Sequence, residues 1–129
     1  MPKDTDPLEE LWREVEEAII KKQLRLSHPY VVDLIRVLEP HVPNGLARQS
    51  VLRALEKNRA DAGLRIPPKF EQAVQHVYNW YSINSREFAK RKAAESEGLF
   101  YSPAGKGSGI WAINRDRAAA WLKAKLENQ

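Results

Sequence analysis

The chain has 129 residues, enough for one domain with a single hydrophobic core, and it contains no cysteine. The lack of cysteine excludes disulfides, cysteine-ligated zinc and thiol catalysis, and it fits a reducing compartment. No apolar run approaches the roughly 18 residues of a membrane span, and the N-terminus lacks the apolar core of a signal peptide, so we expect a cytoplasmic protein.

Charge is distributed unevenly along the sequence. Residues 1–20 carry seven acidic and two basic side chains, a net charge of −5, and the rest carries 19 basic and 10 acidic side chains, a net charge of +9, which together give the overall +4. A strongly basic body is typical of proteins that bind polyanions. Nucleic acid is therefore the leading candidate partner, although a basic surface can also serve solubility alone.

The first two predicted elements are helices. Asp6 followed by Pro7 is typical of a helix N-terminus, and the apolar residues that follow recur on one face, with the acidic residues outside. Ser27 or His28 is the predicted start of the second helix, which ends at Pro40. The turn sequence HVPNG follows it.

Two further helices are predicted in the middle of the chain. The third runs from Leu46 to about Asn58, and the fourth carries an apolar stripe from Phe70 to Tyr81. Beyond a polar break, Ser85 is a possible cap for a short helix or an ordered loop.

A β-hairpin and a last helix complete the prediction. Residues 99–101 and 110–112 are rich in aromatic and β-branched types and are predicted to pair as two antiparallel strands. The turn between them has three glycines, which permit positive φ and leave Lys106 clear of bulky neighbours. Asn114 is predicted to cap the C-terminal helix.

This order of elements predicts a mainly α protein with a small two-stranded β-hairpin, a winged helix-turn-helix with extra N-terminal and C-terminal helices. The expected units are an acidic amphipathic helix in residues 1–26, the winged helix-turn-helix core in residues 27–113 and the C-terminal helix in residues 114–129. The two extra helices are expected to cover the core or to form a homodimer interface.

Two segments, VQHVYNWYSINSREF and GLFYSPAGKGSGIWAI, resemble the winged helix-turn-helix modules attached to bacterial restriction endonucleases, which are related to HARE-type domains of eukaryotic chromatin proteins. The resemblance covers residues 30–113 and is most specific in the hairpin. It departs from the usual serine-aspartate pair of those modules at Ile83 and Asn84. It implies a DNA-binding or DNA-scanning accessory role, in restriction or in reading modified DNA, and it does not imply nuclease activity.

The outward face of the fourth helix carries the candidate base-contacting residues. With the apolar stripe turned inward, this face presents neutral amides and one imidazole. Glutamine and asparagine can make paired hydrogen bonds to adenine in the major groove, and histidine can donate to a base or a phosphate. A plain solvated face is the alternative. The residues of this set are Gln72, Gln75, His76 and Asn79.

Basic side chains on both sides of that helix are the candidate phosphate contacts. They are concentrated in the FAKRKAA segment, and one lies at the tip of the glycine-rich turn. A solvated basic patch and a turn that is only a connection are the alternatives. The set comprises Arg48, Arg53, Lys69, Arg86, Lys90, Arg91, Lys92 and Lys106.

Enzymatic interpretations lack the necessary residues. The three histidines fall on separate predicted elements without metalloprotease spacing, and GKGSG is not followed by the helix of a phosphate-binding loop. We expect no enzyme, metal or cofactor. The leading hypothesis is a protein that binds double-stranded DNA, and the alternatives are a protein-interaction module with the same fold and an RNA-binding protein.

Overall fold

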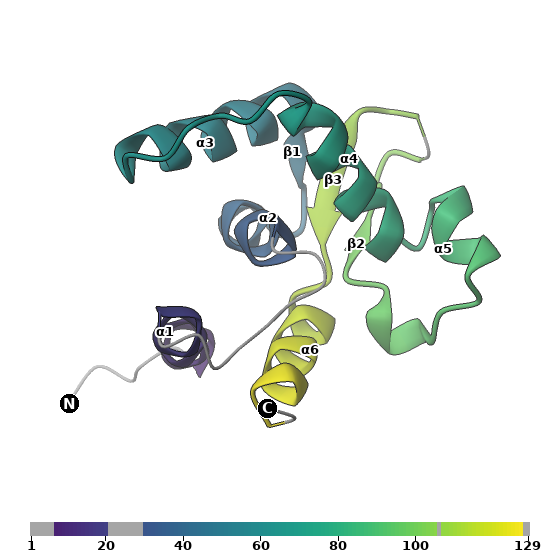
Figure 1. The fold of residues 1–129 in the computed structure, drawn as a ribbon. Coiled ribbons are helices and arrows are strands. Elements are labelled where there is room, and N and C mark those ends of the chain that lie inside the picture. Colours follow the sequence, from purple (N-terminus) through teal and green to yellow (C-terminus); the bar gives the residue numbers. More distant parts are fainter. Residues whose placement is uncertain (1–6, 21–29, 106, 128–129) are drawn as a thin grey trace.

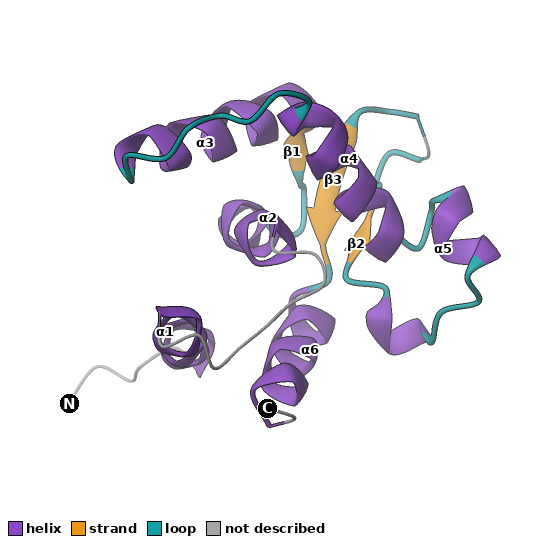
Figure 2. Ribbon diagram, in the orientation of Figure 1, coloured by secondary structure: helices purple, strands orange, loops and turns teal. Residues whose placement is uncertain are grey.

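The computed structural model describes residues 7–20, 30–105 and 107–127, which form a mainly helical protein with a small antiparallel sheet (Figures 1 and 2). Side chains within α1 are described for only part of that helix. In chain order the elements are α1 (Pro7–Ile20), α2 (Tyr30–Leu38), the 3-10 helix η1 (Glu39–His41), β1 (Leu46–Ala47), α3 (Arg48–Asp61), α4 (Phe70–Tyr81), α5 (Arg86–Lys90), the 3-10 helix η2 (Glu95–Glu97), β2 (Phe100–Tyr101), β3 (Ile110–Ile113) and α6 (Arg115–Glu127).

The sheet has three strands in the order β1-β3-β2, so the predicted two-stranded hairpin needs a correction. Leu46, predicted to begin a helix, pairs instead with Trp111 of β3. Gly45 permits this pairing because its φ is 80° and a Cβ there would lie 2.6 Å from the carbonyl oxygen of Trp111. The start of α3 is therefore Arg48, whose backbone N–H donates to the carbonyl of Gly109 at 2.8 Å.

The hairpin packs on the helical core through Phe100 and Trp111, as predicted. Phe100 is fully buried, and Trp111 is 4% exposed. The Trp111 ring stacks on Tyr78 of α4 with the ring centroids 4.0 Å apart and an interplanar angle of 8°. On its other side the core is closed by α2, whose buried residues are Val31, Val32, Leu34, Ile35 and Leu38.

Helices α1 and α6 pack against each other at the end of the molecule remote from the glycine-rich turn (Figure 1). Val15 and Ala18 of α1 are buried, as are Trp121 and Leu122 of α6. The predicted cap of α6 is confirmed, because Asn114 Oδ1 accepts the backbone N–H of residue 117 at 3.1 Å. The apolar stripes of the extra helices thus cover the core within one chain.

The bounds of the central helices agree with the sequence in part. Helix α4 has the predicted limits, whereas α3 continues to Asp61, three residues beyond the predicted end. The predicted helix starts at Asp6 and at Ser27 or His28 lie outside the described residues. None of the helices that the structure describes has both the length and the apolar character needed to cross a membrane.

Candidate nucleic-acid interface

The outward face of α4 carries all four candidate base-contacting residues. Gln72 and His76 are exposed, whereas Gln75 and Asn79 are half-buried. The difference arises because α3 and α5 flank one side of this face, toward which Gln75 and Asn79 are directed. The His76 ring lies against Trp80, with the centroids 5.7 Å apart.

A cleft of about 680 Å³ lies between α4, α5 and the glycine-rich turn. It brings together the amides of Gln75 and Asn79 with three of the predicted phosphate contacts. The described structure therefore gathers candidate base-reading and phosphate-binding groups on one surface. The charged residues that line the cleft are Arg48, Arg86, Glu87 and Lys90, and the segment between β2 and β3 contributes Ser102, Gly107 and Gly109.

Four of these side chains form a continuous series of hydrogen bonds, which we call the amide relay. Arg48 Nε donates to Gln75 Oε1 at 2.7 Å, and Gln75 Nε2 donates to Asn79 Oδ1 at 3.0 Å. Asn79 Nδ2 then donates to Glu87 Oε2 at 3.1 Å. The relay joins α3, α4 and α5 across the cleft.

Glu87 was missed by the sequence analysis. It lies in a segment dominated by basic residues, and no periodicity connects it to Asn79, eight positions earlier. The two side chains meet because α5 folds back beside α4 after the turn at residues 82–85 (Figure 1). The capping pattern at Ser85, which the sequence analysis used, indicates where α5 starts but not the direction in which it runs.

Ser85 fixes α5 against the end of α4. Its Oγ accepts the backbone N–H of Phe88 at 3.0 Å, which confirms the predicted cap, and the same hydroxyl donates to the carbonyl of Asn79. Asn84 Oδ1 accepts the backbone N–H of Ser102 at 2.7 Å. Asn84 thus ties this turn to the segment that follows β2.

Tyr78 and Ser82 contribute hydroxyl groups to the cleft. The Tyr78 hydroxyl donates to the carbonyl of Tyr101 at 3.1 Å and lies 3.0 Å from Ser102 Oγ. Burial raises the pKa of Tyr78 above its usual value, and the neighbouring hydroxyls of Ser102 and Ser82 oppose that shift. Ser82 is 1% exposed, and its Oγ has no hydrogen-bond partner of good geometry among the described residues.

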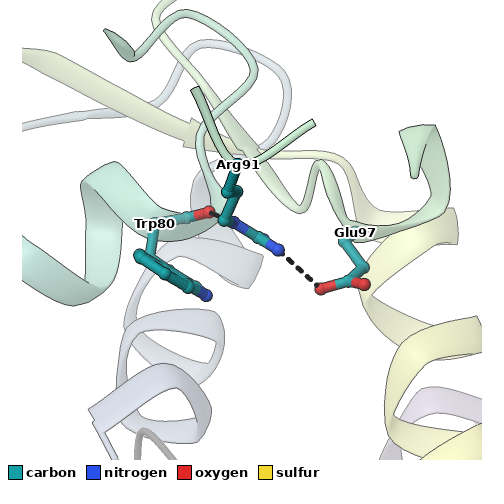
Figure 3. A network of polar contacts seen from close by, with 3 residues as sticks. All are labelled: Trp80, Arg91 and Glu97. Atoms are coloured by element: carbon teal, nitrogen blue, oxygen red, sulfur yellow. Dashed lines mark hydrogen bonds and ion pairs between the residues drawn. The ribbon is translucent and has the colours of Figure 1, made fainter. Parts of the chain in front are cut away.

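Arg91, a predicted phosphate contact, is used inside the protein (Figure 3). Its Nε donates to the carbonyl of Trp80 at 3.0 Å, and its Nη1 pairs with Glu97 at 3.2 Å. The guanidinium carbon lies 4.7 Å from the centroid of the Trp80 ring, and only 17% of the side chain is exposed. Arg91 therefore holds the segment after α5 against α4.

Six of the seven remaining predicted phosphate contacts lie in the described residues, and they fall into two groups. Arg48, Arg86 and Lys90 line the cleft. Outside it, three are exposed, namely Arg53 on α3, Lys69 immediately before α4, and Lys92 beyond α5. Lys106 lies outside the described residues, between Gly105 and Gly107, whose φ values of 98° and 85° are positive as predicted.

Comparison with known proteins finds no relative of this chain, because no family model, no curated protein and no solved structure matches it. The resemblance to restriction-associated modules, with the roles it implies, therefore stays a prediction. In the part of the chain that the structure describes, no group of three or more potential ligands could hold a metal ion. Function is inferred from the fold and the cleft.

Proposed function

We propose that the protein is a winged helix-turn-helix protein that binds double-stranded DNA, with α4 in the major groove. The observation that carries the proposal is the cleft, where the amides of Gln75 and Asn79 lie beside Arg48, Arg86 and Lys90. The order of elements supports it, because three helices interleaved with a sheet of order β1-β3-β2 match a winged helix-turn-helix core. In that core α4 is the recognition helix.

The dimensions of α4 suit the major groove. An α-helix with its side chains is about 10–12 Å in diameter, and the groove is about 12 Å wide, so the 12-residue α4 can lie in it. Gln72 and His76 on the outward face are exposed, and the half-buried Gln75 and Asn79 lie toward α5. Amides in these positions can present a donor and an acceptor to the edge of one base.

Helix α5 supplies the backbone contacts next to that groove. It lies beside the C-terminal half of α4 and carries Arg86 and Lys90, which are exposed and line the cleft. Cations placed there neutralise the phosphates that border the groove and set the register of α4. Lys69 and Lys92 are exposed outside the cleft and can add further phosphate contacts.

One feature departs from the simplest helix-turn-helix. The segment between α3 and α4 spans residues 62–69, eight residues, where that motif has a turn of about three or four. This longer connection is exposed and contains Arg65.

The proposal is tested by mobility shifts on random duplex DNA, single-stranded DNA and RNA over a salt series. We expect duplex binding whose log affinity falls linearly with log salt, by about 0.9 per phosphate contact. Arg86→Met removes one phosphate contact and should therefore make that slope shallower by about 0.9. Lys123→Met, an exposed charge on α6 at the remote end, should not.

Other results would favour the alternatives. Tighter binding to RNA than to duplex DNA would indicate an RNA-binding protein. No binding to any nucleic acid at low salt would contradict the proposal and leave the protein-interaction module as the better hypothesis.

A further inference from the structure

The amide relay has ends of fixed polarity. The Arg48 guanidinium can only donate hydrogen bonds, and the Glu87 carboxylate can only accept them. Gln75 must therefore turn its oxygen toward Arg48 and its NH₂ toward Asn79, which must in turn direct its NH₂ at Glu87. Reversing either amide would bring two donors or two acceptors together, so one orientation of the pair satisfies all three hydrogen bonds.

Glu87 needs an explanation beyond packing. It is the one acidic residue among those lining the cleft in the described structure, where Arg48, Arg86 and Lys90 are the cations. A carboxylate at a surface that binds phosphates opposes the approach of DNA, so it lowers non-specific affinity. A carboxylate at this position therefore needs a role that offsets the repulsion. The hydrogen bond that Glu87 accepts from Asn79 indicates that this role is to orient the Asn79 amide.

We infer that Glu87 and Arg48 are positioning residues that set the donor and acceptor orientation of Gln75 and Asn79, and through it the base preference of the protein. This inference rests on the proposed DNA-binding function. Each amide uses one N–H and one oxygen lone pair in the relay and retains one of each for a base. Because the orientation is already fixed in the free protein, DNA binding does not have to select it.

The first test is selection from a randomised duplex library at one salt concentration, with wild type, Glu87→Gln and Glu71→Gln. Glutamine at position 87 keeps the size of the side chain but can donate as well as accept, so it no longer fixes the relay. Glu71 is exposed on α4 and does not line the cleft, so Glu71→Gln matches the charge change alone. Thermal melts establish that both variants fold.

We expect Glu87→Gln to weaken the preference at the base pairs read by Gln75 and Asn79. The same selection with Gln75→Ala and with Asn79→Ala locates those base pairs. The loss should be about 5- to 150-fold in discrimination, the range for one amide–base pair. Both charge variants should bind all duplexes somewhat more tightly, and Glu71→Gln should keep the wild-type preference. An unchanged preference in Glu87→Gln overturns the inference.

A second measurement does not depend on DNA. In ¹H–¹⁵N spectra the side-chain NH₂ groups of Gln75 and Asn79 should lie apart from those of exposed amides. In Glu87→Gln the Asn79 signal should move toward the exposed values, while Glu71→Gln leaves both signals in place. Unmoved signals in Glu87→Gln would mean that Glu87 does not orient the amides.

These experiments distinguish a failure of the proposed DNA-binding function from a failure of the positioning role of Glu87. If wild type binds no duplex while the Asn79 signal still moves in Glu87→Gln, the relay exists but the proposed function and the role in base preference both fall. If Glu87→Gln loses only a preference for cytosine at one pair, and the pairs read by Gln75 and Asn79 keep theirs, Glu87 reads that base directly and is not a positioning residue.

Discussion

Two neighbouring residues, Lys90 and Arg91, show how little a basic cluster says about the role of each cation in it. Lys90 is exposed and lines the cleft, whereas Arg91 is hydrogen-bonded to Trp80 and paired with Glu97. The long guanidinium side chain can lie flat on aromatic rings while it donates at its edge, which suits it to the inward position.

This contrast predicts different effects of two matched substitutions. Lys90→Met should flatten the salt dependence of duplex binding by about 0.9 and leave stability nearly unchanged. Arg91→Met should lower the free energy of unfolding by about 1–3 kcal/mol, because it leaves Glu97 and a backbone carbonyl without their partner, and it should keep the salt slope. Urea unfolding and salt titrations measure both. A shallower salt dependence of duplex binding in Arg91→Met would instead indicate that Arg91 contacts a phosphate.

A second residue-scale prediction concerns alkaline pH. Burial raises the pKa of Tyr78 and of Tyr81 in the folded protein, so each keeps its proton at a pH where the unfolded chain, with a pKa of about 10, has lost it. Their contribution to stability is complete below that unfolded pKa and is lost as pH rises through the folded pKa.

Urea unfolding between pH 8 and pH 11 tests this. The free energy of unfolding should fall above about pH 10, less steeply in Tyr78→Phe and in Tyr81→Phe, and least in the double variant. A double variant whose pH dependence parallels wild type would show that these two phenols are not the groups responsible.

At the scale of elements, the short strand β1 connects the cleft to the sheet. Leu46 and Ala47 pair with β3, and Arg48, the first residue of α3, reaches Gln75 directly from the end of this strand. The position of Arg48, the α3 end of the amide relay, therefore depends on the pairing of β1 with β3. Gly45 is the residue that allows it.

Gly45→Ala should consequently destabilise the fold. Alanine at a φ of 80° costs about 1–2 kcal/mol in the left-handed region, and its Cβ would meet the Trp111 carbonyl oxygen at 2.6 Å. Gly63→Ala is the control, because its φ is 74° but nothing lies within 4 Å of the added Cβ. Thermal unfolding should show a larger loss at position 45. Equal losses would mean that the backbone conformation, not the contact with β3, sets the cost.

At the scale of the whole molecule, the acidic and basic parts of the sequence lie apart. The acidic helix α1 packs on α6 at the end remote from the glycine-rich turn, so its exposed carboxylates are far from the cleft (Figure 1). Their effect on a polyanion must act through solvent. The repulsion between these carboxylates and a polyanion in the cleft then depends on ionic strength, since the Debye length is about 30 Å at 0.01 M and about 8 Å at 0.15 M.

The triple variant Glu10→Gln, Glu14→Gln and Glu17→Gln tests this separation. All three side chains are exposed. At 0.01 M salt the variant should bind every duplex more tightly than wild type, and at 0.15 M the two should bind alike, with the same base preference throughout. A changed preference, or a difference that persists at 0.15 M, would indicate that α1 contacts the nucleic acid.

Much of the fold could be predicted from local patterns. The 3.6-residue period of apolar residues gave α4 its limits and its outward face, and the capping residues Ser85 and Asn114 marked the starts of α5 and α6. The prediction was wrong at Leu46, because two residues carry too little pattern to distinguish the first turn of a helix from a strand when the pairing partner is 65 positions away.

The sequence by itself therefore determined which residues α4 turns outward and which segments are helical, since both depend on neighbours three or four positions apart. Only the tertiary structure decided which cations share the cleft, that Arg91 turns inward, and that Gln75 and Asn79 lie between Arg48 and Glu87. Those contacts join residues 27, 11 and eight positions apart. They exist because the core fixes how α3, α4 and α5 pack, and no local period encodes that packing.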